Sequence, residues 1–303
     1  MWQRQFQQLT DFGCLAPDLP GHGLSRRVPW RSLEQSADMV ATIIREYIPS
    51  GRSHIVGLSL GSYVGLSLLS QHPDVVERAV LSGINILPLP QKWLIDAAAY
   101  AIAPLLKTRW GARLNSRALK IPPDQFDGYH QSLRELSLRS FVAASHNASG
   151  FTIPGNLAVI RTPTLLVAGE HEHPLIRASI EQLHRMLPVS QARVVEGVGH
   201  AWNGERPELF SATLKAWCAR RSSGAIGGFS DRVTVAKPRD HRAAFSPVQA
   251  CRASASSTKR AAWSAPASSP YRAITVTPTG KPPSAMSFGT LTQGTPISVH
   301  RRL

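Results

Sequence analysis

Apolar positions follow two different periods along residues 11–220. Short apolar runs of strand length, at 53–56, 79–83 and 163–169, are separated by segments in which apolar residues recur every three or four positions. The first pattern is typical of buried strands and the second of amphipathic helices. Strands that alternate with helices indicate a parallel sheet covered by helices. We therefore expect an α/β fold over this part of the chain.

Ser32 marks the clearest predicted helix start. Gln35 follows it three residues later, which is the spacing of a capping box, and Pro49 ends the pattern. The apolar side chains of this helix share one face: Leu33, Ala37, Val40, Ile44 and Tyr47. The face predicts that the helix packs on the sheet.

Residues 87–158 interrupt the alternation of strands and helices. They contain consecutive helical patterns, among them 93–106 and 129–144. We expect this segment to form a helical lid, inserted between the two parts of the core at 1–86 and 159–220. A lid of this kind is where substrate selectivity would reside.

Residues 221–303 lose both patterns and are rich in Ser, Ala, Pro, Arg and Gly. Such a segment buries too little apolar surface to offset its chain entropy, so we expect a disordered tail. The basic charge of the chain is concentrated here, with 12 Lys and Arg against 2 Asp and Glu, a net charge of +10. Residues 1–220 carry 22 against 17, a net charge of +5. The tail has no zinc spacing or RNA-binding signature, so we expect no specific nucleic-acid partner.

The three cysteines, Cys14, Cys218 and Cys251, are few, odd in number and far apart, which argues against a disulfide framework and a thiolate zinc site. No apolar run reaches the roughly 18 residues that span a bilayer. These observations favour a cytoplasmic protein without a membrane partner. The oligomeric state stays open.

The segment Gly57-Leu58-Ser59-Leu60-Gly61 carries the first sign of chemistry. It follows a strand-like run and precedes a helical pattern, so Ser59 is expected at the apex of a sharp turn. The flanking glycines allow neighbouring elements to approach without a Cβ clash. A serine on such a turn is typical of a nucleophile.

A nucleophilic serine needs a base to remove its proton and an acid to orient that base. The strand at 163–169 leads into Gly169-Glu170-His171-Glu172-His173, and the last predicted strand leads into Gly197-Val198-Gly199-His200. The order along the chain is serine, acid, histidine, which is the order of α/β-hydrolases.

With these motifs and the turn Asp18-Leu19-Pro20-Gly21-His22-Gly23-Leu24-Ser25, residues 1–220 resemble the α/β-hydrolase superfamily, in its branch of lid-bearing small-molecule esterases. The resemblance implies that Ser59 is the nucleophile, His200 the base and Glu172 the acid. It also implies an oxyanion donor at the backbone N–H of Leu60. The family usually has an aspartate at the position of Glu172, but a glutamate can serve, because the role is that of a carboxylate that accepts from the imidazole. Glu170 is the competing candidate for the acid.

We expect no metal and no cofactor. His171 and His173 flank Glu172, but their spacing is not the helical H-E-x-x-H pattern of zinc enzymes, and no third ligand is evident. His22 is expected to hydrogen-bond within its own turn.

The resemblance begins downstream of the family's first three strands and of the loop that carries the second oxyanion donor. We therefore expect an N-terminally truncated sheet in which the strands near Leu15 and Ile55 lack a partner or pair directly, with lowered stability and activity. The implied function is hydrolysis of a small-molecule ester through an acyl-enzyme. A catalytically impaired remnant is the alternative, and C–C bond, lactone or thioester hydrolysis and acyl transfer are alternative chemistries.

Overall fold

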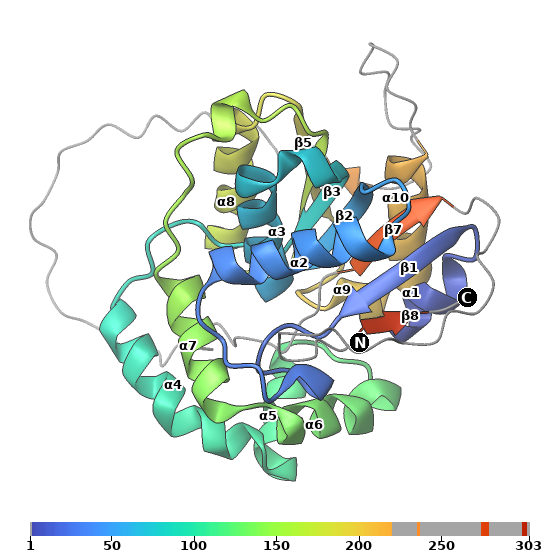
Figure 1. Cartoon of the computed structure of the whole chain (residues 1–303). Coiled ribbons are helices and arrows are strands. Elements are labelled where there is room, and N and C mark those ends of the chain that lie inside the picture. Colours follow the sequence, from blue (N-terminus) through green and yellow to red (C-terminus); the bar gives the residue numbers. More distant parts are fainter. Residues whose placement is uncertain (1, 220–234, 237–273, 279–298, 302–303) are drawn as a thin grey trace, which may run out of the picture.

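The computed structural model describes residues 2–219, 235–236, 274–278 and 299–301. Figure 1 shows a twisted sheet with helices on both faces and a separate group of helices at one end. The strands are β1 (Phe12–Pro17), β2 (Ser53–Leu58), β3 (Val76–Ser82), β4 (Thr164–Gly169), β5 (Ser190–Val195), β6 (Val235–Ala236), β7 (Ile274–Pro278) and β8 (Val299–Arg301). The α-helices are α1 (Gln3–Gln8), α2 (Leu33–Tyr47), α3 (Leu60–Gln71), α4 (Lys92–Leu106), α5 (Arg109–Ala118), α6 (Phe126–Glu135), α7 (Leu138–Ser149), α8 (Pro174–Met186), α9 (Trp202–Glu205) and α10 (Pro207–Cys218). Short 3₁₀ turns lie at Gly23–Ser25, Pro73–Val75, Pro123–Gln125 and Leu157–Val159.

The centre of the sheet is parallel, as the alternation of strands and helices predicts. The strand order is β6-β5-β4-β3-β2-β7-β1-β8, and the four strands from β2 to β5 pair in parallel. Parallel strands end at the same edge of a sheet. The turns that follow β2, β3, β4 and β5 therefore gather at one edge, which holds the candidate site.

Successive residues of the central strands face two different cores. Ile55, Leu81 and Leu166 pack with α2, α3 and α8 on one face, whereas Val80 and Leu165 pack with α1, α9 and α10 on the other. This alternation follows from the pleat of a strand, whose side chains point to opposite faces in turn. Because both faces are covered, the strands are apolar along their length.

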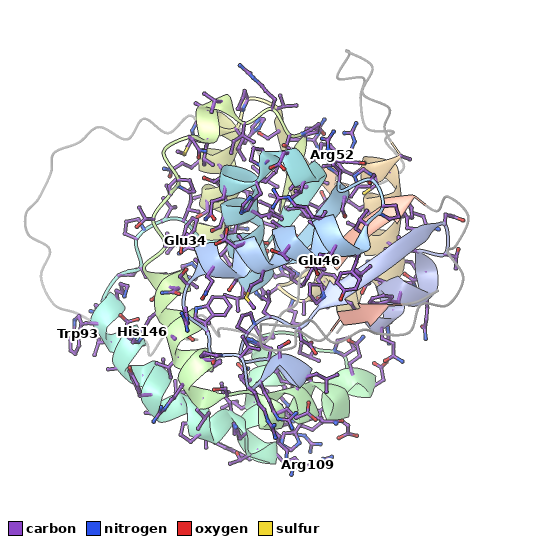
Figure 2. All side chains as sticks on the ribbon, in the orientation of Figure 1. Glu34, Glu46, Arg52, Trp93, Arg109 and His146 are labelled. Atoms are coloured by element: carbon purple, nitrogen blue, oxygen red, sulfur yellow. The ribbon has the colours of Figure 1, made fainter. Side chains whose placement is uncertain are left out.

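Helix α2 begins as the sequence predicts. The Ser32 side chain accepts a hydrogen bond from the Gln35 N–H at 3.1 Å, and the helix ends at Tyr47. The apolar face lies on the core, and Glu34 and Glu46 point away from it into the solvent (Figure 2).

Helices α4 to α7 have a small core of their own; this segment, which the sequence predicts to be a lid, is called the lid below. Its buried residues are Ala103, Leu106, Ala112, Phe126, Leu133, Leu136, Phe141 and Val142. On the outer side of α4, Trp93 is 70 % exposed and projects from the surface (Figure 2).

The prediction of one continuous helix over 129–144 is wrong, because α6 ends at Glu135 and α7 begins at Leu138. The Ser137 N–H donates to the Gly21 carbonyl at 3.0 Å instead of continuing the helix, and the Ser137 side chain caps α7. A long-range contact with the core therefore decides this boundary.

The expectation for β1 and β2 is also corrected. These strands neither pair directly nor lack partners, since β7 lies between them and runs antiparallel to both. Cys14 of β1 and His54 of β2 both face Val276 in the register. The segment that pairs with both strands was not predicted to be a strand, because it lies in the part of the chain expected to be a disordered tail.

Most of the predicted disordered tail lies outside the described residues. Within 221–303 the structure describes only β6, β7 and β8, and each of them pairs antiparallel with its neighbours in the sheet. Cys251 is outside the described residues as well. Cys14 and Cys218 are buried thiols without a disulfide, and burial raises their pKa to about 11 and about 12.

Candidate active site

Ser59 lies at the turn between β2 and α3, in a backbone conformation that is unusual for a residue with a side chain. Its φ is 54° and its ψ is −118°. A backbone hydrogen bond stabilises this conformation, because the Ser59 N–H donates to the Ser82 carbonyl at 2.8 Å. A Cβ atom at Gly57 would lie 2.4 Å from the Gly61 carbonyl oxygen, which explains the glycine at that position. Strained residues of this kind cluster at functional sites.

Ser82 connects the serine turn to the rest of the site. The Ser62 hydroxyl lies 2.7 Å from the Ser82 carbonyl and 2.9 Å from its N–H, which ties the start of α3 to the end of β3. The Trp202 indole N–H donates to the Ser82 hydroxyl at 2.9 Å from the other side. Sequence reasoning missed these three contacts, since each joins residues far apart in the chain.

His200 and Glu172 are brought together at the same edge of the sheet. Nδ1 of His200 is hydrogen-bonded to Oε1 of Glu172. The second Glu172 oxygen accepts from the Gly169 N–H at 2.7 Å, and the carboxylate is buried. With both oxygens engaged, Glu172 holds the imidazole in one orientation.

Glu170 is placed elsewhere, although it lies only two residues away. Its carboxylate accepts from the Gly197 N–H at 2.8 Å and thereby fastens the turn that leads to His200. Of the two acidic candidates in the sequence, Glu172 is the one that lies against His200.

Gly83, directly after β3, lies beneath the His200–Glu172 pair and was not singled out by the sequence. Its φ is +68°, and a Cβ atom there would lie 2.7 Å from Cε1 of His200 and 3.0 Å from Oε1 of Glu172. Because Ser59 is bonded to Ser82 and His200 lies against Gly83, the serine and the histidine flank the same strand end. A glycine directly after a buried strand was the only sequence signal.

Leu60 begins α3 immediately after the serine. The first N–H groups of a helix have no acceptor within the helix. The Leu60 N–H is thus available to an oxygen atom bound beside Ser59. The buried Leu60 side chain belongs to the core.

The neighbouring histidines have structural contacts. His173 accepts from the Leu175 N–H at 3.2 Å and caps α8. His22 contacts the Pro20 carbonyl at 2.8 Å, which confirms the prediction that it bonds within its own turn. Among the described residues, no three His, Cys, Asp or Glu side chains are grouped so that they could hold a metal ion.

The turn after β1 is stabilised by a hydrogen bond of its own and packs closely against the lid. Asp18 is buried and accepts from the Leu24 N–H at 3.0 Å. Next to it, a Cβ atom at Gly21 would lie 2.1 Å from Cβ of Ser140 in α7, so only glycine allows the lid to approach this closely.

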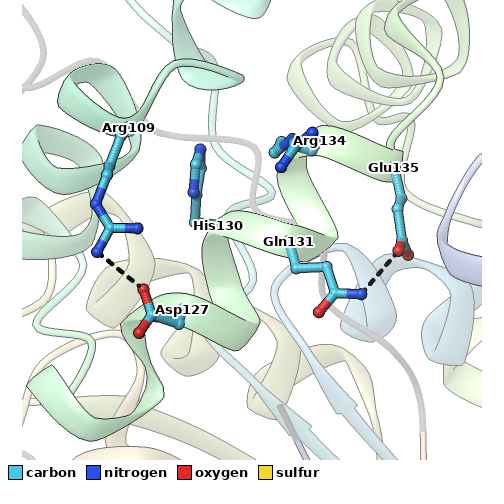
Figure 3. A pocket seen from close by; sticks show the side chains of 6 residues that line it. All are labelled: Arg109, Asp127, His130, Gln131, Arg134 and Glu135. Carbon is cyan, nitrogen blue, oxygen red and sulfur yellow. Dashed lines mark hydrogen bonds and ion pairs between the residues drawn. The ribbon is translucent and has the colours of Figure 1, made fainter.

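A hollow of about 520 Å³ lies on the lid, between α5 and α6 (Figure 3). It is lined by Arg109, Asp127, His130, Gln131, Arg134 and Glu135. Arg109 pairs with Asp127 at 3.2 Å, and Gln131 donates to Glu135 at 3.0 Å. These walls are polar and include none of the triad candidates, unlike the mostly apolar pockets that hold small molecules.

None of the helices in the described part of the chain has both the length and the apolar character needed to cross a bilayer.

Comparison with known proteins gives one consistent result. An AB hydrolase superfamily protein of Gibberella zeae is 27 % identical over 214 residues, which cover 68 % of this chain and 70 % of that protein. The pimeloyl-[acyl-carrier protein] methyl ester esterase of Nitrosomonas europaea is 24 % identical over 71 % of this chain and 89 % of its own length. Among solved structures, a thermophilic esterase from Thermogutta terrifontis has the same fold, with a TM-score of 0.57, 21 % identity and coverage of 71 % of this chain and 83 % of that one.

The family model of the alpha/beta hydrolase family matches residues 1–213, which include strands β1 to β5, helices α4 to α7 and every candidate site residue. The chain therefore belongs to the alpha/beta hydrolase family and is a hydrolase of that fold.

Proposed function

We propose that the chain is a serine hydrolase that cleaves a small-molecule ester through Ser59, His200 and Glu172. The observation that carries the proposal is that the serine turn and the histidine–glutamate pair both lie at the end of β3. The strained Ser59 turn is bonded to Ser82, and the His200–Glu172 pair lies against Gly83. The esterase names among its relatives support an ester as substrate.

In the proposed reaction, the Ser59 hydroxyl attacks the ester carbonyl carbon while Nε2 of His200 takes its proton. The negative oxygen of the tetrahedral intermediate accepts from the Leu60 N–H. Collapse of the intermediate breaks the bond to the alcohol, which leaves with the proton from His200. Water then attacks the acyl-Ser59 ester in the same way, so that the acid is released and the serine is restored. Glu172 stabilises the imidazolium form of His200 both when the acyl-enzyme forms and when water hydrolyses it.

A fluorophosphonate probe tests the nucleophile, since it reacts with activated serines. We expect the probe to label the wild-type chain and not Ser59→Ala. The control is Ser70→Ala, because Ser70 lies on the same helix and bonds only to the surface residue Asn156. Labelling of Ser59→Ala at the wild-type rate would exclude Ser59 as the reactive group.

The two glutamates provide a matched test of the acid. Glu172→Gln should lower kcat by a large factor, about 10²-fold or more, because the amide cannot stabilise the imidazolium as a carboxylate does. Glu170→Gln keeps an acceptor for the Gly197 N–H and should stay within a few-fold of wild type. Steady-state hydrolysis of a short-chain nitrophenyl ester measures both. The reverse ranking would assign the acid to Glu170.

The second candidate is a catalytically impaired hydrolase. It is favoured by the direction of β7, which runs antiparallel to β2, so the carboxyl end of β7 lies at the sheet edge opposite the candidate site. Losing one oxyanion donor costs roughly 10²-fold to 10³-fold in turnover. Labelling of Ser59 by the probe without measurable ester turnover would favour this candidate.

A further inference from the structure

Lys120, at the end of lid helix α5, has a left-handed backbone with φ 54°. Its N–H donates to the Arg117 carbonyl at 3.1 Å, and the Ile121 N–H donates to the Ser116 carbonyl at 2.8 Å. This is the hydrogen-bond pattern of a Schellman helix end, where glycine is favoured because it has no Cβ. A lysine at this position accepts local strain, so the contacts of its side chain need an explanation.

The Lys120 side chain lies against Gly199, the residue before His200. A Cβ atom at Gly199 would lie 2.9 Å from Cδ of Lys120 and 3.1 Å from Oε1 of Glu205. The space beside Gly199 is therefore filled from two sides. Lys120 comes from the lid and Glu205 from the end of α9.

Glu205 holds the backbone of the histidine turn. Its two carboxylate oxygens lie 3.0 and 3.2 Å from the Gly199 N–H, which donates to both. Burial raises the pKa of Glu205, whereas the Gly199 hydrogen bond and the charges of Lys120 and His171 lower it, and Glu172 raises it further. Lys120 and His171 thus favour the ionised carboxylate, which is the stronger acceptor.

The same part of the lid contacts α9 at further points. A Cβ atom at Gly204 would lie 3.2 Å from Oε1 of Gln125 and 3.3 Å from Cδ of Pro122. Arg4 of α1 also pairs with Asp124. The lid segment from Lys120 to Gln125 is therefore fastened to the structure that carries His200.

We propose that Glu205 is a positioning residue for His200 and that Lys120 couples the lid to it. Glu205 fixes the Gly199 amide, and with it the direction from which the imidazole approaches Ser59. Lys120 packs on the same glycine from the lid, so displacement of the lid loosens the histidine turn. The inference rests on the proposed function of His200 as the base.

Glu205 is tested with three variants. Glu205→Ala removes the acceptor for the Gly199 N–H. We expect kcat to fall about tenfold or more with little change in KM, because a small displacement of a catalytic group lowers the rate of the chemical step strongly. Glu205→Gln keeps an acceptor oxygen and should recover most of the loss. Glu208→Ala, which removes an exposed glutamate of α10, is the control and should have the wild-type kcat.

Lys120→Gly separates catalysis from stability. Glycine relieves the positive φ, so the thermal midpoint should stay equal or rise, while kcat falls several-fold through the lost contact with Gly199. Gln91→Gly is the matched control, because Gln91 is an exposed lid residue with φ 52° at the start of α4. It should gain the same relief of strain and keep the wild-type kcat.

The measurements are ester turnover, the rate of fluorophosphonate labelling at Ser59 and thermal unfolding, all on the full chain. A wild-type kcat for Lys120→Gly, or for a folded Glu205→Ala, would overturn the proposal. If Glu205→Ala does not fold, Lys120→Gly alone decides. A wild-type chain that is not labelled at Ser59 would instead contradict the proposed function, so the two failures are distinguishable.

Discussion

At the scale of single residues, Gly83 connects the two halves of the candidate site. The preceding residue, Ser82, accepts the Ser59 N–H, and the His200 ring lies against Gly83 itself. No side chain could occupy this position without moving the imidazole. The site therefore depends on a residue that has no chemistry of its own.

Gly83→Ala tests this dependence, with Gly51→Ala as its control. Both glycines have a positive φ, +68° and +64°, so each alanine should destabilise the fold by about 1 kcal/mol. Only the new Cβ at Gly83 meets other atoms, because none lies within 4 Å of the corresponding position at Gly51. We expect kcat to fall at least tenfold for Gly83→Ala and to stay unchanged for Gly51→Ala. Equal kcat values in the two variants would contradict this role.

His54 predicts how stability depends on pH. It is buried in β2, and burial lowers its pKa below the ordinary value of 6.5, an effect that Glu77 opposes and Arg78 reinforces. Below pH 6.5 the unfolded chain binds the proton more readily than the folded chain, so the free energy of unfolding should fall as the pH drops from 7 towards 5. His54→Leu should make this decrease shallower in urea titrations at several pH values. An equally steep decrease in the variant would show that other groups cause it.

At the scale of elements, the N-cap of α2 depends on residues that are close together in the chain, and the sequence predicts it. Ser32→Ala should lower the free energy of unfolding by about 1 kcal/mol, because the Gln35 N–H loses its acceptor. Thr42→Ala on the exposed side of the same helix removes only a bond to the Asp38 carbonyl and should be neutral or slightly stabilising. Urea titration compares the two. Ester turnover should be unchanged in both, since the side chains of Ser32 and Thr42 bond only within α2 and its cap.

The elements that the sequence predicts correctly are those with local causes. The capping box at Ser32 and the buried strand before Ser59 depend on residues a few positions apart. The break between α6 and α7 could not be predicted in this way, because it depends on the Gly21 carbonyl of a distant turn. The packing around Gly199 was missed for the same reason, because Lys120, which lies beside this glycine together with Glu205, comes from a distant part of the chain. Motifs thus indicate where the reacting groups lie, and tertiary contacts decide what holds them.

At the scale of the whole molecule, the sheet depends on a segment from near the end of the chain. Strand β7 supplies the backbone partners between β1 and β2, and β2 carries Ser59 at its end. A strand with neighbours on both sides uses its N–H and carbonyl groups in the two ladders, so its loss would leave both neighbours with unpaired groups. The position of the serine turn is thereby linked to residues 274–278.

Val276→Pro tests this link, because Val276 lies opposite Cys14 of β1 and His54 of β2. Proline removes an N–H from the middle of the sheet, so the free energy of unfolding should fall by at least about 1 kcal/mol. Val276→Thr keeps the N–H and a β-branched side chain and is the control. Hydrogen exchange should accelerate in β1 and β2 of the proline variant and not in β4, whose partners are β3 and β5. If both variants unfold and exchange alike, β1 and β2 do not depend on β7, and the stability of this sheet comes from its parallel half and the helices that cover it.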